Sequence, residues 1–331
     1  MRVLIVKMSS LGDVIHTLPA LNDAVAAIPG IRFDWVVEEA FAEIPAWHPA
    51  VDRVFPIALR RWRKKPMKNF RGPEWKKFRT SIGRRQYDLV IDAQGLLKSA
   101  MVARLVNAPR YGMDKRSVRE QLASLFYHHA IAVPKKLHAV ERTRMLFAQS
   151  LNYPIPTSQG DYGVRSNLKY GSDKLPASLL FFHGTARAEK LWPVDHWIEL
   201  ARLLEAKNFK LWLPWGSEKE RQRADHIAGS VNNAEVLPKL NLLGLASMLM
   251  EVDGVVAVDT GLAHLSAALD VPTVSLYGPT DIDLIGAYGH NQVHVASPVS
   301  VADTTDPEVM MESIRAQEVC SALLELLSEQ K

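Results

Sequence analysis

Residues 252–280 read VDGVVAVDTGLAHLSAALDVPTVSLYGPT and carry the clearest indication of secondary structure in the chain. Residues 255–258 form a short apolar run rich in valine, which predicts a strand buried on both faces. Asp259-Thr260-Gly261 ends the run, and leucine and alanine then recur at helical spacing. A second apolar run over 273–277 stops at Gly278-Pro279-Thr280. The stretch therefore predicts a parallel strand–helix–strand unit.

The turn between this strand and the helix predicts an anion site. It lies at the carboxyl edge of the sheet, where open α/β folds bind ligands, and the helix start offers free N–H groups and partial positive charge to a phosphate. Gly261 lets the backbone approach, the Thr260 hydroxyl can donate, and His264 lies one turn into the helix. Asp and Thr are also ordinary helix caps, so the residues alone leave a phosphate site and a plain cap equally open.

The composition indicates a cytoplasmic protein of two domains. The chain has 331 residues, of which 47% are hydrophobic, and domains average about 150 residues. No apolar run approaches the roughly 18–20 residues of a membrane span, and the N-terminus predicts a first strand rather than a signal peptide. The single cysteine, Cys320, excludes an internal disulfide.

The charge is divided unevenly along the chain. Residues 1–160 hold 26 Lys/Arg and 13 Asp/Glu, whereas residues 161–331 hold 14 and 23. A basic half joined to an acidic half suggests domains with different partners, and the basic half should attract an anion.

Both halves alternate short apolar strands with helices, which predicts an α/β protein of two doubly wound parallel sheets. Residues 152–176 are rich in Pro, Gly, Ser and Asn and predict the linker. We therefore expect an N-terminal domain over 1–160 and a C-terminal domain over 161–310. A terminal helix is predicted over 307–330, and residues 311–331 form the last segment of the chain.

The first strand, predicted over 2–7, leads into the turn Met8-Ser9-Ser10-Leu11-Gly12-Asp13, and helical spacing then runs from Val14 to Ile28. Ser10 or Asp13 could simply cap this helix. Alternatively, Asp13 is a carboxylate at the carboxyl edge of the first sheet, facing a partner domain across a cleft. The turn lacks the G-x-G-x-x-G fingerprint, which argues against a nicotinamide oxidoreductase.

Residues 60–79 form a basic segment with ten Lys/Arg, one Glu and interleaved aromatic residues. A solvated pair of basic helices is the simplest interpretation. Basic and aromatic residues together are also how proteins hold single-stranded nucleic acid or dock on anionic lipid. Arginine further suits bidentate capture of phosphate or carboxylate.

Four motifs together resemble the ADP-heptose:lipopolysaccharide heptosyltransferases, a family of inverting glycosyltransferases with the GT-B fold. They are D-T-G-L-A-H-L-S-A-A-L with Y-G-P-T-D downstream, S-S-x-G-D at Asp13, D-x-Q-G-L-x-K-S from Asp92, and H-x-T-x-x-x-x-K-x-W-P from His183. The resemblance covers almost the whole chain. It implies two Rossmann-like domains facing across a cleft, with residues 311–331 packing back across the junction.

The resemblance also implies the reaction. L-glycero-D-manno-heptose would pass from ADP-heptose to the inner Kdo of Kdo-lipid A in a single inverting displacement, with no cofactor or metal. The protein would be cytoplasmic and peripheral at the inner face of the cytoplasmic membrane. The R-R-W-R-K and S-S-L-G-D segments favour the member that adds the first heptose over heptosyltransferase II, which adds the next.

The resemblance assigns roles to individual residues. Asp13 would be the catalytic base, Thr185 and Lys190 would contact the donor phosphates, and Glu220 would bind the ribose, although alone it is an ordinary first-turn residue. Where the family often has a second Thr this chain has Ala186, which puts one phosphate hydrogen bond in question. The remaining donor-binding residues would be Asp259, Thr260, Gly261 and His264. The acceptor-binding residues would be Ser10, Arg60, Arg61, Arg63, Lys64, Gln94, Lys98 and Arg119.

A D-x-D sequence at Asp281-Ile282-Asp283 matches the metal-diphosphate signature of a different glycosyltransferase fold, and we interpret it here as structural. The alternative from another class is a protein that binds nucleic acid through residues 60–79. It predicts steep salt dependence and no donor turnover, and it leaves the second domain unexplained.

Overall fold

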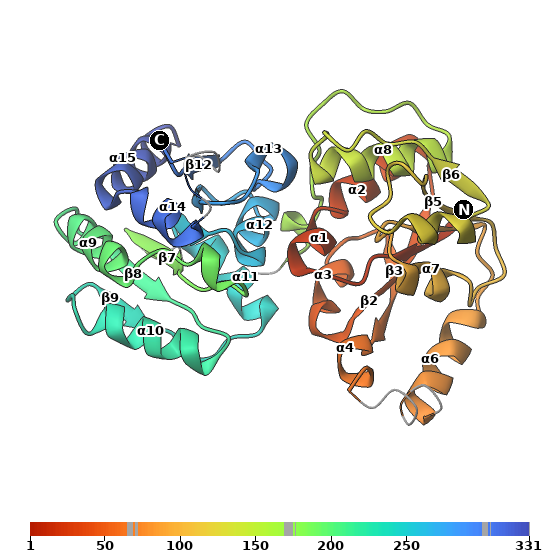
Figure 1. The fold of residues 1–331 in the computed structure, drawn as a ribbon, viewed down its shortest axis with the longest axis horizontal. Coiled ribbons are helices and arrows are strands. Elements are labelled where there is room, and N and C mark those ends of the chain that lie inside the picture. The colour runs from red at the N-terminus through yellow and green to blue at the C-terminus, as the bar shows by residue number, and fades with distance from the viewer. Residues whose placement is uncertain are drawn as a thin grey trace. The chain divides into compact units, whose positions relative to one another are not determined.

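The computed structural model describes residues 1–64, 69, 72–168, 175, 177–299, 304 and 306–330. The chain divides into two compact units, unit 1 over Met1–Asn167 and unit 2 over Leu168–Lys331. Each unit holds one six-stranded sheet with helices on both faces, as Figure 1 shows.

The sheet of unit 1 has the order β3-β2-β1-β4-β5-β6, with all neighbouring strands parallel. Its strands are β1 (Arg2–Val6), β2 (Arg32–Glu38), β3 (Val51–Ile57), β4 (Leu89–Asp92), β5 (Arg110–Met113) and β6 (His129–Ile131). Its helices are α1 (Leu11–Ile15), α2 (Leu18–Ala27), α3 (Glu43–Ala46), α4 (Leu59–Trp62), α6 (Pro73–Gly83), α7 (Leu97–Ala103) and α8 (Ala139–Leu151), with 3₁₀ helices η1 (Glu39–Phe41), η2 (Gln121–Phe126) and η3 (Arg165–Asn167).

The sheet of unit 2 has the order β12-β11-β10-β7-β8-β9, again all parallel. Its strands are β7 (Ser178–Phe182), β8 (Lys210–Leu213), β9 (Ala234–Val236), β10 (Gly254–Val258), β11 (Thr273–Tyr277) and β12 (Gln292–Ala296). Its helices are α9 (Val194–Glu205), α10 (Glu218–Ala228), α11 (Leu242–Glu251), α12 (Gly261–Ala268), α13 (Ile282–Ile285), α14 (Pro307–Ser313) and α15 (Ala316–Ser328), with the 3₁₀ helix η4 (Ala188–Lys190).

The central strands are buried on both faces, which explains their continuous apolar runs. In unit 1, Leu4 and Val6 pack with Phe78 and other residues of α6 and α7, while the opposite face lies under α2 and α8 (Figure 1). In unit 2, residues of β7, β10 and β11 pack against the apolar faces of α9, α10 and α15. Trp192 and Trp197 are fully buried there, with ring centroids 5.0 Å apart.

Two predicted helices are each interrupted. The helix expected from Val14 to Ile28 is divided into α1 and α2, because Pro19 in the first turn of α2 cannot continue a preceding helix. The helix expected over 307–330 is divided into α14 and α15 at Ile314, whose carbonyl accepts a hydrogen bond from Trp192 Nε1 at 3.1 Å. That bond replaces the helical one which the carbonyl would otherwise accept.

The C-terminal helix α15 packs against α9 and against the strands β10, β11 and β12. Its Val319, Leu323 and Leu326 belong to the core of unit 2. These contacts lie inside unit 2, and the expected packing of residues 311–331 back across the junction stays a prediction. Within the described residues no helix is both long and apolar enough to cross a membrane.

Candidate active site

Both units place their candidate residues at the same topological position. Numbered within each unit, both sheets have the order 3-2-1-4-5-6, so the strand order reverses between β1 and β4 and again between β7 and β10. Ligands of doubly wound folds bind at the carboxyl ends of the strands at this reversal. Asp13 and Gln94 follow β1 and β4, and Thr185 and Asp259 follow β7 and β10.

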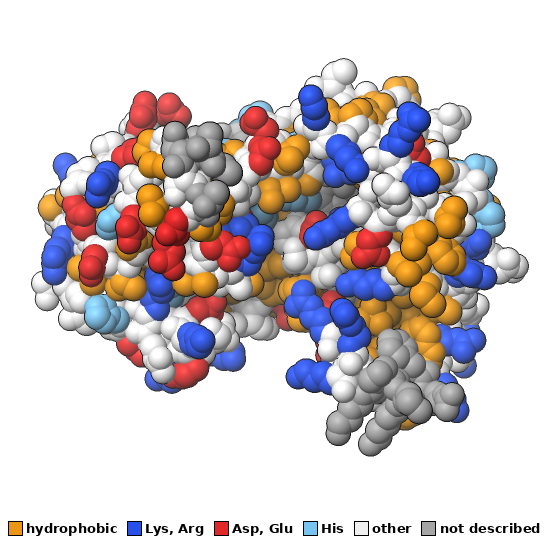
Figure 2. All heavy atoms as spheres, viewed as in Figure 1, with side chains coloured by type: hydrophobic (Ala, Val, Ile, Leu, Met, Phe, Trp, Pro, Cys, Tyr) orange, Lys and Arg blue, Asp and Glu red, His pale blue; other side chains and the backbone are white. Residues whose placement is uncertain are grey.

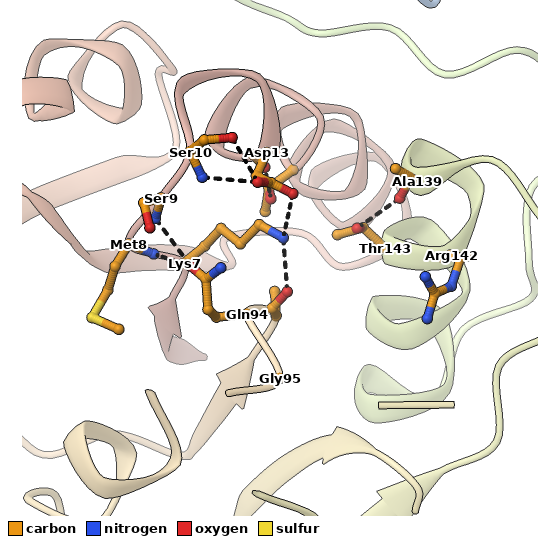
Figure 3. A network of polar contacts seen from close by, with 12 residues as sticks. Lys7, Met8, Ser9, Ser10, Asp13, Gln94, Gly95, Ala139, Arg142 and Thr143 are labelled. Carbon is orange, nitrogen blue, oxygen red and sulfur yellow. Dashed lines mark hydrogen bonds and ion pairs between the residues drawn. The ribbon is translucent and has the colours of Figure 1, made fainter. Parts of the chain in front are cut away.

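Asp13 is held by the turn that precedes it. The Ser10 backbone N–H and Ser10 Oγ both donate to Asp13 Oδ2 at 2.8 Å, and Lys7 Nζ lies 3.6 Å from Asp13 Oδ1. Lys7 itself is buried and donates to the carbonyl of Ala93 at 3.0 Å (Figure 3). The Asp13 side chain remains 36% exposed, so a substrate can reach it.

This environment keeps Asp13 ionised. Burial alone would raise its pKa, but the Lys7 ammonium and the two hydrogen bonds from Ser10 outweigh burial and hold the pKa of Asp13 below its ordinary value of 3.8. The positive charge of Arg119 acts in the same direction. The sequence analysis did not identify Lys7 as a partner of Asp13, although a lysine closing an apolar strand is itself a visible signal.

Gln94 connects the turns after β1 and β4. Its Oε1 accepts hydrogen bonds from the backbone N–H groups of Met8 at 2.8 Å and Ser9 at 3.0 Å (Figure 3). Gln94 is itself placed by the buried Asp92, which accepts from the N–H groups of Gln94 and Gly95. The contacts of Gln94 position the Asp13 turn, while its predicted contact with the acceptor stays a prediction.

The other predicted acceptor residues follow β3, β4 and β5 at the same edge. Arg63, Lys64, Lys98 and Arg119 are exposed. Arg61 is half-exposed and forms ion pairs with Glu39 at 3.1 Å and Glu74 at 3.0 Å. The guanidinium of Arg60 lies 5.2 Å from the centre of the Phe41 ring.

The aromatic residues of the basic segment face inward where they are described. Trp62 and Phe78 are 3% and 6% exposed, Trp75 packs on both, and Trp62 Nε1 donates to Glu74 at 2.8 Å. Trp62 and Phe78 are therefore not available to stack on nucleic-acid bases or to enter a bilayer, and Trp75 is partly buried against them. Residues 65–68, 70 and 71 of the segment lie outside the described residues.

Asp259 organises the candidate donor site of unit 2. Its Oδ2 lies 2.5 Å from both Lys190 Nζ and Thr280 Oγ1, and its carbonyl accepts from Thr185 Oγ1 at 3.0 Å. The structure thus brings together the predicted Thr185, Lys190 and Asp259 and adds Thr280. The Y-G-P-T-D motif contained Thr280, but nothing in the sequence indicated that it meets Asp259.

Helix α12 begins directly beyond this cluster. Gly261 is its first residue, and the Thr260 side chain makes no capping hydrogen bond. Asp259 and Thr260 therefore do not act as an ordinary helix cap, which was one of the two alternatives in the sequence analysis. His264 is buried in the first turn. Asp281 caps α13 by accepting from the N–H of Asp283 at 3.1 Å, which fits the structural interpretation of the D-x-D sequence.

Glu220 forms a capping box at the start of α10. Its Oε2 accepts from the N–H groups of Gly216 at 2.7 Å and Ser217 at 2.9 Å, and Ser217 Oγ accepts from the Glu220 N–H at 3.3 Å. A Cβ at Gly184 would lie 2.8 Å from Glu220 Oε1, so the carboxylate lies against the turn after β7. Glu220 therefore caps α10, which is the ordinary first-turn role that the sequence analysis also considered. It lies at the carboxyl edge of the unit 2 sheet, where a residue that binds the ribose would have to lie.

Among the residues that the structure describes, no three His, Cys, Asp or Glu side chains gather where they could hold a metal ion. Unit 1 thus presents an ionised carboxylate among basic residues, and unit 2 presents a lysine and a helix N-terminus, which suit phosphate.

Residues 75–314 match glycosyltransferase family 9 (heptosyltransferase). The chain belongs to this family. A lipopolysaccharide heptosyltransferase 1 from Pseudomonas aeruginosa is 56% identical over 298 residues, covering 90% of this chain and 84% of that protein. One from Escherichia coli K12 is 52% identical over 303 residues, covering 90% and 94%. The solved structure of E. coli heptosyltransferase WaaC with ADP has a TM-score of 0.92 at 48% identity, covering 98% of this chain and 100% of that one.

These relationships confirm the expected GT-B fold and the expected class of enzyme, an ADP-heptose:lipopolysaccharide heptosyltransferase. The relatives at 52–56% identity are heptosyltransferases of the first type, which the sequence analysis favoured over heptosyltransferase II. The nicotinamide oxidoreductase and nucleic-acid-binding alternatives are set aside. The roles of individual residues stay predictions.

Proposed function

We propose that this enzyme transfers L-glycero-D-manno-heptose from ADP-heptose to the inner Kdo of Kdo-lipid A, with inversion at the anomeric carbon and with Asp13 as the base. The observation that carries the proposal is the setting of Asp13, a carboxylate held ionised by Lys7 and Ser10 yet open to substrate. Membership of the heptosyltransferase family supports the donor and the sugar transferred.

Asp13 would take the proton of the attacking Kdo hydroxyl. Because the pKa of Asp13 is low, the carboxylate is ionised at neutral pH, and it accepts the proton as the hydroxyl becomes acidic during bond formation. The transition state has oxocarbenium character, as in glycoside hydrolysis. Lys7 and Gln94 fix the turn that carries the base.

Unit 2 would bind the donor and stabilise the leaving ADP. The ammonium of Lys190 and the start of α12 are donors that can face a diphosphate as its charge grows, and the Thr185 hydroxyl would join them by turning its one proton away from the Asp259 carbonyl. Glu220 would bind the ribose hydroxyls beside Gly184. In this proposal Lys190 and α12 carry the leaving-group charge, and no metal or cofactor is assigned a role.

The basic unit 1 would bind the acceptor. Kdo carboxylates and lipid A phosphates are acidic, and Arg60, Arg61, Arg63, Lys64, Lys98 and Arg119 follow strands at the edge that carries Asp13. Because the acceptor is a membrane lipid, we place the enzyme in the cytoplasm, peripheral at the inner face of the cytoplasmic membrane.

The test is to incubate the protein with ADP-heptose and Kdo-lipid A in the presence of EDTA. We expect the lipid to gain the mass of one heptose, with ADP released and the anomeric configuration inverted by NMR. A product of retained configuration would contradict the single displacement, and loss of turnover that added Mg²⁺ restores would contradict the metal-free assignment. Transfer only to an acceptor that already carries one heptose would identify the second enzyme instead.

A further inference from the structure

Unit 1 exposes three large apolar side chains on two neighbouring elements. Met101 of α7 and Leu122 and Leu125 of η2 are 58%, 62% and 75% exposed, the three highest values among large hydrophobic residues in the part of the chain described. Figure 2 shows hydrophobic side chains gathered on unit 1, with Lys and Arg side chains around them. We call Met101, Leu122 and Leu125 the apolar patch.

The geometry of η2 explains why two leucines point outward. In a 3₁₀ helix residues i and i+3 lie above one another, so Leu122 and Leu125 share one side. Ala123 and Phe126 share another and pack on the small core around Ala100 and Tyr127. The leucines of η2 therefore face solvent, while its smaller Ala123 and its Phe126 face the core.

Contacts at both ends of η2 join it to α7. Glu120, just before η2, accepts from the N–H of Leu97 at 2.7 Å, and the guanidinium of Arg104 lies 5.4 Å from the centre of the Phe126 ring. Met101 lies between Leu97 and Arg104 along α7. The elements that carry the three apolar residues therefore pack against each other, with the basic Arg104 directly after α7.

The charge around the apolar patch suits an anionic surface. Residues 96–129 contain six Lys/Arg and two Asp/Glu, and both acids are used internally, Asp114 by the N–H groups of Arg116 and Ser117 and Glu120 by Leu97. Lys115 and Arg116 are exposed in the turn that leads toward η2. Exposed leucine and methionine beside basic residues are the composition of interfacial membrane anchors.

The apolar patch is also connected to the catalytic edge. The N–H of Glu120 donates to the carbonyl of Gly95 at 3.1 Å, next to the Gln94 that holds the Asp13 turn. Arg119, one residue before, is close enough to lower the pKa of Asp13. A bilayer in contact with η2 would therefore lie beside the residues proposed to meet the sugar of a lipid acceptor.

We infer that the apolar patch inserts into the surface of an anionic phospholipid bilayer, with Arg104, Lys115 and Arg116 on the lipid head groups. This inference rests on the proposed function, because it is the lipid acceptor that brings the enzyme to a membrane. Among the aromatic residues of the basic segment, Trp62 and Phe78 are buried and therefore cannot supply this membrane contact.

The test is co-sedimentation with vesicles of phosphatidylethanolamine containing phosphatidylglycerol. The double variant Leu122→Ser/Leu125→Ser should bind about tenfold more weakly than wild type, because bilayer affinity scales with buried apolar area. Its melting temperature should not fall, because both side chains are exposed. The matched control is Leu243→Ser on α11, also an exposed leucine on a helix, which should bind as wild type does.

Activity separates this inference from the proposed function. With a Kdo-bearing acceptor that lacks acyl chains, the double variant should keep the wild-type kcat/KM, while its KM for acceptor in vesicles should rise. Equal vesicle binding by wild type and double variant would overturn the inference, and so would a loss of binding that accompanies a change from oligomer to monomer. Wild type that binds vesicles but transfers nothing either to Kdo-lipid A in vesicles or to the acyl-free acceptor would instead refute the proposed function.

Discussion

Lys7 is the largest of the influences that lower the pKa of Asp13, and its removal should appear in the pH profile. Asp13 is a base only when ionised, so activity falls as the pH drops through its pKa. In the wild type that pKa lies below 3.8. In Lys7→Met, burial remains to raise the pKa of Asp13 while the opposing ammonium is gone, so the acidic limb of kcat/KM against pH should move to higher pH.

The control for Lys7→Met is Lys135→Met, which removes an exposed lysine elsewhere in unit 1. Its pH profile should overlay that of the wild type. If the Lys7 variant also overlays it, with wild-type activity at low pH, Lys7 does not tune the base.

Lys190 has two roles that a pair of variants can separate. Lys190→Ala should weaken ADP-heptose binding by about 1.5–3 kcal/mol, the range for hydrogen bonds to charged groups. It should also lower stability by roughly 1–3 kcal/mol, because the mostly buried Asp259 loses its ion pair. Adding Asp259→Asn should recover stability but not affinity. Normal calorimetric affinity in Lys190→Ala would remove this lysine from the phosphate site.

At the scale of the element, Glu220 caps α10 whatever else it does. Glu220→Ala should cost about 1 kcal/mol of stability through the lost cap and should raise the donor KM if the ribose role is correct. Glu220→Gln keeps an oxygen for the Gly216 and Ser217 N–H groups, so the fold should melt almost as wild type while donor KM still rises. A Gln variant with the wild-type donor KM would reduce Glu220 to a cap.

The basic residues that follow β3 fall into two groups, one that forms ion pairs within the fold and one that is proposed to bind the acceptor. Arg61 is paired with Glu39 and Glu74, whereas Arg63 and Lys64 are exposed. Arg63→Gln/Lys64→Gln should raise acceptor KM and flatten its salt dependence, because screened charge attraction is removed, and should leave donor KM unchanged. Steady-state kinetics at two salt concentrations test this; donor and acceptor constants that move together would refute the assignment of the acceptor to unit 1.

At the scale of the whole molecule, the sequence predicted what depends on local pattern. The βαβ unit at 252–280 appears as β10, α12 and β11, because its apolar runs, turn residues and helical spacing agree with one another. The positions of Asp13, Lys190 and Asp259 at carboxyl edges followed from that topology. What local pattern lacks is the distance between remote residues: the contact of Thr280 with Asp259 and the inward packing of Trp62 both depend on tertiary packing.

The most direct test of the central claim is the rate of heptose transfer by Asp13→Asn, measured under single-turnover conditions so that chemistry limits the rate. The substitution keeps the shape of the side chain and removes the charge, and loss of a general base typically costs ~10²–10⁴-fold. We predict a fall in kcat of that order, with near-normal ADP-heptose affinity and an unchanged melting temperature. An Asp13→Asn enzyme that keeps more than about a tenth of the wild-type rate would contradict the assignment of Asp13 as the base.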